Sequence, residues 1–222
     1  MSLPRLLSLG LALCLLASDA LAGAWPQAKG AGFASATVRL SWPQDLGTWT
    51  SLEPTGQYRT LYMEYGLTER LTLGLDLGRS VSGDAKTVAF LRWPLRQSDP
   101  GLRVAAEVGL GQIDGAAVLR PGLSLGLGRD WGWMAADALV ELPGGGRAAE
   151  KLDLTLGLHL PSDRMLLLQV QSGAPADGPG FVRLAPSLVT PLFRKVQTEL
   201  GGSWSLTGDR TMGVTMGLWT RF

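Results

Sequence analysis

The sequence predicts a transmembrane antiparallel up-and-down β-barrel of about twelve strands, preceded by an N-terminal signal peptide. Three observations predict this all-β fold: apolar residues that alternate with polar or small ones, aromatic residues at the ends of the alternating segments, and an apolar leader. The composition agrees, because 45% of the residues are hydrophobic, 18% are charged and 30 are glycine. It excludes a disordered chain and disfavours long helices, in which each interior glycine costs about 1 kcal/mol. The formal net charge of +1 shows no basic excess suited to nucleic acid.

The first 22 residues have the order of a secretory signal peptide. Arg5 precedes an apolar run over residues 6–17, and Ala20-Leu21-Ala22 forms a small-residue cleavage site. We therefore expect a signal peptide over residues 1–22 and an outer-membrane barrel domain over residues 23–222.

The leader also holds the single cysteine, Cys14. A lipoprotein processing site there is disfavoured, because Leu13 stands where a small residue should precede the cysteine. The mature domain would then contain no disulfide and no thiolate metal site. No later window of about 18 residues is apolar and uncharged, which leaves a periplasmic protein or a membrane barrel.

Alternation with a period of two residues favours the barrel. Leucine occupies the odd positions from Leu71 to Leu77, and Thr72, Gly74, Asp76 and Gly78 occupy the even ones. The pattern recurs over residues 102–110, 151–158 and 211–218. Each is a strand with one apolar face and one polar or small face.

Such segments predict twelve strands, an even number that fits a bacterial barrel with both termini in the periplasm. Most are about nine to eleven residues long, as a tilted membrane strand requires. They lie near residues 32–42, 57–65, 70–79, 86–93, 101–111, 117–127, 132–142, 150–160, 164–172, 180–190, 195–205 and 210–222.

The connections between strands alternate between outer loops and inner turns, as a barrel requires. The inner turns at residues 66–69 and 161–163 are tight, although the one at 94–100 is long, and the longest connection falls on the outer side. The outer connections are rich in Gly, Pro, Asp and Ser, and they span residues 43–56, 80–85, 112–116, 143–149, 173–179 and 206–209.

Aromatic residues mark the predicted membrane boundaries, where an amphipathic ring sits at headgroup level. Trp42, Tyr65, Trp93 and Trp204 lie at strand ends on the leucine face, while Trp131 and Trp133 begin a strand and Phe222 ends the chain. A soluble secreted β-barrel or sandwich is the alternative. Its solvated face would be dense in Lys, Glu and Asp, whereas the polar face here mixes charge with Gly, Ala and Thr.

The last strand, residues 213–222, closes on an aromatic residue and resembles the C-terminal strand of Gram-negative outer-membrane barrels. That resemblance implies an outer-membrane location, contact with outer-membrane lipid, and recognition of Phe222 by the barrel-assembly machinery. Residues 23–30 and the hairpin at 64–74 are also similar to small barrels of the Xag type and to transport barrels of exopolysaccharide or catabolic gene clusters. This second resemblance implies polysaccharide export components as partners.

If leucine faces lipid, the opposite parity lines the lumen with six basic and seven acidic residues. Near-balanced charge suggests cross-strand ion pairs, for example Arg103 or Arg120 with Glu107 or Asp137. The predicted lining residues are Arg39, Glu64, Asp76, Arg92, Arg103, Glu107, Arg120, Asp137, Glu141, Lys151, Asp153, Arg183 and Glu199. We expect glycines on this face to leave space for a small polar pathway, at positions 74, 78, 109, 122, 126, 157, 201, 213 and 217.

Catalysis is not predicted. His159, the single histidine, has Ser162 as its nearest serine, and strand parity does not place the two together as a nucleophile and base require. One histidine and scattered carboxylates form no metal-ligand cluster, and Gly126-Leu127-Gly128 lacks the following helix of a phosphate-binding loop. We predict that the protein is not an enzyme and binds no cofactor.

Three functions remain open. The first is a passage for a small polar or saccharide-like solute, tied to exopolysaccharide export, with the lumen residues as solute contacts. The second is a closed structural or adhesive barrel that acts through its outer loops, above all residues 43–56 with Trp49. The third is an envelope lipid hydrolase that uses His159.

Overall fold

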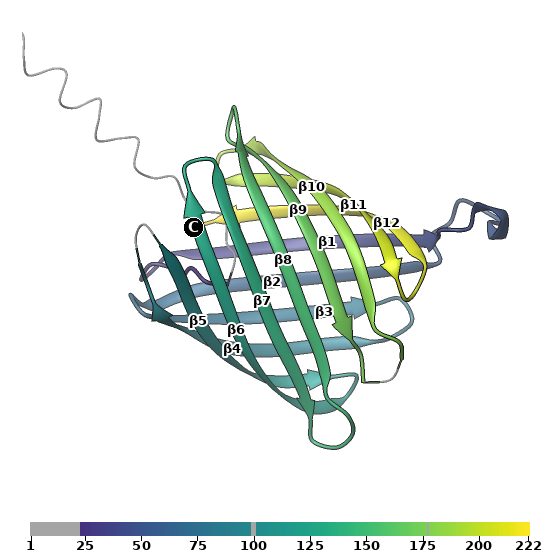
Figure 1. The fold of residues 1–222 in the computed structure, drawn as a ribbon, viewed down its shortest axis with the longest axis horizontal. Coiled ribbons are helices and arrows are strands. Elements are labelled where there is room, and N and C mark those ends of the chain that lie inside the picture. Colours follow the sequence, from purple (N-terminus) through teal and green to yellow (C-terminus); the bar gives the residue numbers. More distant parts are fainter. Residues whose placement is uncertain (1–22, 99–100, 177) are drawn as a thin grey trace, which may run out of the picture.

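The computed structural model describes residues 23–98, 101–176 and 178–222; the predicted signal peptide and Cys14 lie outside the described residues. The described chain forms a closed antiparallel barrel in which each strand pairs with its neighbours in sequence and β1 pairs with β12 (Figure 1). The strands are β1 (Gly32–Pro43), β2 (Gly56–Thr68), β3 (Leu71–Ser80), β4 (Ala85–Arg96), β5 (Leu102–Ile113), β6 (Ala116–Arg129), β7 (Gly132–Pro143), β8 (Ala149–Leu160), β9 (Arg164–Ala174), β10 (Phe181–Phe193), β11 (Val196–Thr207) and β12 (Thr211–Arg221).

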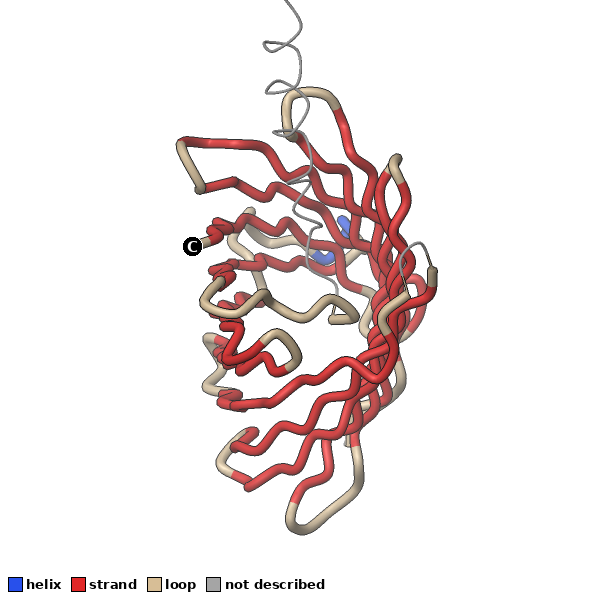
Figure 2. The backbone as a smooth tube through the Cα atoms, turned by 90° about the vertical axis from the view of Figure 1, so that its left-hand side faces the viewer, coloured by secondary structure: helices blue, strands red, loops and turns tan. Residues whose placement is uncertain are grey.

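The closed twelve-stranded barrel confirms the predicted fold class. Figure 2 turns the molecule and shows strands along nearly the whole wall, with short loops at their ends. The connection between β1 and β2 contains one 3-10 turn, η1 (Leu46–Thr48). In the part of the chain that the structure describes, no helix is long and apolar enough to cross a membrane.

Two strands run further than predicted because proline does not end them. β4 continues through Pro94 to Arg96, and β10 through Pro191 to Phe193, with a shift of strand register at each proline. Proline donates no ladder hydrogen bond, and a bulge is where a sheet tolerates it. The prediction that Pro94 opens the inner turn was therefore wrong.

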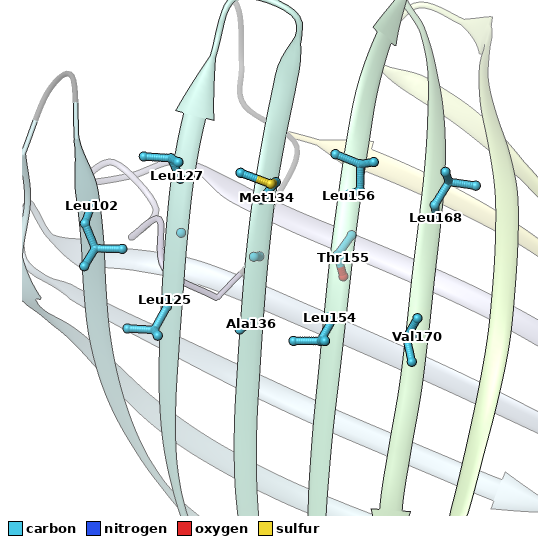
Figure 3. A pocket seen from close by; sticks show the side chains of 12 residues that line it. Leu102, Leu125, Leu127, Met134, Ala136, Leu154, Thr155, Leu156, Leu168 and Val170 are labelled. Carbon is cyan, nitrogen blue, oxygen red and sulfur yellow. The ribbon is translucent and has the colours of Figure 1, made fainter. Parts of the chain in front are cut away.

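The leucines on the predicted lipid parity face outward along the wall. Leu110 is 63% exposed and Leu218 is 50% exposed, although both lie inside long strands. Figure 3 shows a shallow hollow on this outer face, lined almost entirely by apolar side chains of β5 to β9. Thr155 is its one polar lining residue, and the outward-facing leucines dominate it, so the hollow is part of the lipid-facing surface.

The lumen glycines do not leave open space, which corrects the expectation drawn from the sequence. Aromatic rings occupy the positions above several of them: Phe90 lies over Gly74, Tyr58 over Gly78, Trp25 over Gly126 and Trp133 over Gly157. A Cβ atom at these glycines would overlap the ring. The glycines thus leave room only for the large rings that pack on them, from a neighbouring strand or, for Trp25, from the segment before β1.

The aromatic residues divide between the two faces. Tyr65, Trp93, Trp131 and Trp204 are 37 to 49% exposed near strand ends, as a headgroup belt requires. Trp133, by contrast, is only 3% exposed and points into the barrel. It therefore belongs to the interior packing and not to the belt.

The periplasmic end of the interior is filled. Trp133, Met165, Leu167 and Val189 form a buried apolar cluster with Ala24, Trp25 and Ala135, against which Trp219 packs. Ala24 and Trp25 come from the irregular segment that precedes β1, so residues 23–31, here called the N-terminal segment, fold into the barrel. Apolar burial thus holds a non-strand segment in place.

Candidate functional site

One wall of the lumen carries a continuous ladder of alternating charges, formed by residues of β2 to β6. Lys86 Nζ lies 2.7 Å from Asp76 Oδ2, and Arg120 Nη1 lies 2.6 Å from the same oxygen. Arg120 Nη2 lies 3.4 Å from Glu107 Oε1, so the ladder continues to Glu107. The predicted pairing of Arg120 with Glu107 is therefore confirmed.

The ladder ends on the N-terminal segment. Arg92 binds Glu107 with Nη2 at 2.7 Å from Oε2, and it also pairs with Glu64. Glu64 then accepts a hydrogen bond of 2.8 Å from Gln27 Nε2, while the Gln27 backbone N–H donates to Thr72 Oγ1 at 3.0 Å. Three cations and three carboxylates pair along this wall, so its formal charges cancel, although Arg120 Nε is buried without a hydrogen-bond partner among the described residues.

The opposite wall is polar but carries no ion pair among the described residues. Arg39 Nη2 donates to Gln171 Oε1 at 3.3 Å, Gln171 donates to Gln169, and Gln169 donates to Thr155. Glu199 accepts from Ser187 at 2.8 Å. This wall thus presents amides, hydroxyls and one guanidinium to the interior of the barrel.

A cavity of about 370 Å³ lies between the two walls. Of the thirteen residues predicted to line the lumen, eight line this cavity: Arg39, Asp76, Arg92, Glu107, Arg120, Asp137, Asp153 and Glu199. Glu64 is buried in the ladder beside it. Strand parity therefore identified the interior face correctly, but only part of it surrounds the cavity.

The remaining predicted residues lie nearer the ends of the barrel. Lys151 binds Glu141 at 2.7 Å, close to the extracellular end. Arg103 donates to Gln97 at 2.8 Å and lies over the Trp25 ring, near the periplasmic end. Neither the suggested pairing of Arg103 with Glu107 nor that with Asp137 is found among the contacts that the structure describes.

Arg183 reaches the extracellular rim, where its Nη2 lies 2.9 Å from Asp209 Oδ2. Burial by itself raises the pKa of Asp209, but hydrogen bonds from Ser205 and Thr211 and the charge of Arg183 outweigh it. The pKa of Asp209 therefore lies below its ordinary value, and the loop between β11 and β12 is tied to the rim by a charged group.

His159 lies at the periplasmic end of β8, on an exposed position, with its ring centroid 5.8 Å from that of Trp133. No hydrogen bond within the described chain joins its side chain to a serine. The described residues also contain no group of three or more His, Cys, Asp or Glu side chains that could hold a metal ion.

Sequence reasoning missed the uncharged part of the site. Thr155, Gln169 and Trp219 line the cavity on the lumen parity, so the same alternation could have found them. The N-terminal segment could not be found in this way, because it has no periodic pattern and its contacts join residues far apart in sequence.

Three solved structures are similar to this barrel. A KdgM porin in complex with disordered oligogalacturonate matches with a TM-score of 0.63 and 10% identity, over 85% of this chain and 99% of the porin. The NanC porin matches with a TM-score of 0.61 and 7% identity, over 84% and 98%. The COG4313 outer membrane channel from Pseudomonas putida F1 matches with a TM-score of 0.55 and 11% identity, over 92% and 97%.

No protein-family model and no curated protein sequence matches the chain. The structural likeness, at these identities, shows the fold. Together with the closed barrel and its apolar outer face, it shows a small β-barrel of the outer-membrane type, located in the bacterial outer membrane.

Proposed function

We propose that this barrel is a non-enzymatic outer-membrane passage for a small polar or saccharide-like solute. The observation that carries the proposal is the 370 Å³ cavity between a closed charge ladder and a row of hydrogen-bonding side chains. That volume lies within the range of small-molecule sites, about 300–1,000 Å³. The similar KdgM structure was obtained with an oligogalacturonate, which supports a saccharide-like solute.

The polar wall suits a hydroxyl-rich solute. Gln169, Gln171 and Thr155 present alternating donors and acceptors along neighbouring strands. Arg39 lines the same cavity, and its Nη2 donates to Gln171 Oε1 at 3.3 Å. Its guanidinium adds charged donors that a solute hydroxyl could accept from.

Liposome swelling and single-channel recording in planar bilayers test the proposal. We expect discrete conductance steps and uptake of small sugars. Gln169→Leu with Gln171→Leu should slow sugar uptake, whereas Ser172→Leu, on the outward parity of the same strand, should not. A barrel that never conducts and excludes small sugars would contradict the proposal.

A second candidate is a closed structural or adhesive barrel, and the N-terminal segment favours it by filling the periplasmic end of the lumen. The same recordings separate the two functions. Deletion of residues 44–55 should abolish surface binding if the barrel acts through that loop, where Trp42 and Trp49 stack with ring centroids 6.2 Å apart.

We also propose a setting in polysaccharide export, on the strength of the sequence resemblance, with Phe222 as the signal to the barrel-assembly machinery. Flanking glycosyltransferase genes would support this setting and a flanking catabolic operon would contradict it. Deletion of Phe222 should reduce the amount of folded barrel in the outer membrane.

A further inference from the structure

Two arginines lie directly opposite each other on the outside of the barrel. Arg59 of β2 pairs with Arg79 of β3 in the strand register, and both side chains are exposed. They share the outward parity with Leu61 and Leu77, the next pair toward the membrane. Arg79 is followed by Ser80, the last residue of β3, so the pair lies near the extracellular ends of its strands.

This arrangement is unfavourable for the isolated protein. Like charges directly opposite each other on an antiparallel pair are destabilising. Within the described residues, neither arginine forms an ion pair or a side-chain hydrogen bond. Asp84, a carboxylate in the loop after β3, accepts hydrogen bonds from Ser80 at 2.8 Å and Ser82 at 2.9 Å.

The surface below the two arginines is apolar. Proceeding toward the periplasm, the outward-facing pairs are Leu61 with Leu77, Met63 with Leu75, and Tyr65 with Leu73. Leu61, Tyr65 and Leu73 are 37 to 43% exposed. The two strands therefore present an apolar column that is capped by two guanidinium groups.

We propose that Arg59 and Arg79 bind the phosphate of a phosphorylated glycolipid of the outer leaflet, of the lipid A type, with its acyl chains along the column below. Two planar guanidinium groups match the geometry of one phosphate, whose charge offsets their repulsion. The apolar column matches the acyl chains in the same molecule. A free anion would use the arginines but not the column.

Native mass spectrometry of the intact barrel in detergent tests the proposal. We expect the protein to retain bisphosphorylated lipid A and to bind phosphate-free lipid A about tenfold more weakly, a loss that corresponds to about 1.4 kcal/mol. The double substitution Arg59→Gln with Arg79→Gln should reduce retention of bisphosphorylated lipid A to the same level.

The matched control is Arg147→Gln with Arg210→Gln, which removes two charges from extracellular loops and should leave retention unchanged. Heat-modifiable gel mobility shows whether each variant is a folded barrel. Unchanged retention in the Arg59 and Arg79 variant would overturn the proposal, as would equal binding of phosphate-free lipid A. Inorganic pyrophosphate that binds as tightly as lipid A would show an anion site instead, and would also overturn it.

Discussion

Asp137 of β7 and Asp153 of β8 lie directly opposite each other in the barrel wall, and both line the lumen cavity. Neither carboxylate forms an ion pair with a described residue. Among the described residues around the cavity, five acidic side chains face three guanidinium groups, so acidic groups outnumber basic ones in the lining by two. The overall balance of the chain therefore conceals a local acidic bias.

This bias predicts a preference for cations, because charged side chains around a constriction select ions of opposite sign. Asp137→Asn with Asp153→Asn should shift the reversal potential in a salt gradient toward the value expected of an anion-selective channel. Glu150→Gln, an outward-facing position on β8, is the control and should leave the potential unchanged. An anion-selective wild-type channel would contradict the assignment.

The N-terminal segment narrows the periplasmic end, so its release should enlarge the passage. Trp25 is 5% exposed and packs against Gly126, while Gln27 holds Glu64 and Thr72. We expect Trp25→Ala with Gln27→Ala to raise the single-channel conductance. Lys29→Ala, an exposed position in the same segment, should have no effect. Equal conductance of the double variant and the wild type would show that the segment does not restrict ion flow.

The charge ladder should be essential for stability. Arg92 binds both Glu64 and Glu107, and all three side chains are almost fully buried. Arg92→Gln leaves Glu64 without its cation and Glu107 with Arg120 alone, and breaking such a buried pair costs about 3–5 kcal/mol. Urea unfolding of the barrel in lipid vesicles, followed by tryptophan fluorescence, measures the loss. Arg96→Gln, at the exposed end of the same strand, should cost far less.

Position 157 should tolerate only glycine, because the Trp133 ring packs directly on it. A Cβ atom there would overlap the Trp133 ring, so Gly157→Ala should destabilise the barrel by about 1–3 kcal/mol, as overpacking does. Gly145→Ala is the control, because no heavy atom lies within 4 Å of a Cβ at that loop position. Equal unfolding midpoints for the two variants would contradict the close packing of Trp133 on Gly157.

The tie between Arg183 and Asp209 predicts a pH dependence at the extracellular rim. The pKa of Asp209 is lowered in the folded barrel, so its stabilising contribution is present above the unfolded value of about 3.9 and is lost as the pH falls through the folded value. Asp209→Asn should therefore lower the unfolding temperature at pH 7 but not at strongly acidic pH. Since the pair is partly exposed, the loss in the free energy of unfolding should be below about 1 kcal/mol. Asp130→Asn is the control and should leave the unfolding temperature unchanged.

The sequence by itself determined the barrel, the number of strands and the two faces of each strand. Leu73 and Asp76, for example, are assigned to lipid and lumen by parity alone, because side chains alternate along any extended strand. The same rule places Arg39, Arg120 and Asp153 inside, and it could have placed Gln169 there too.

Only the tertiary structure decided which interior groups meet and how much space remains. Glu64 lies 28 residues from Arg92 and 37 from Gln27, and barrel closure brings these three side chains together. Local patterns contain no information on such contacts, since they depend on register and on packing across the lumen. For the same reason Gly126, which from sequence alone appeared to leave open space, is where Trp25 of the N-terminal segment is held.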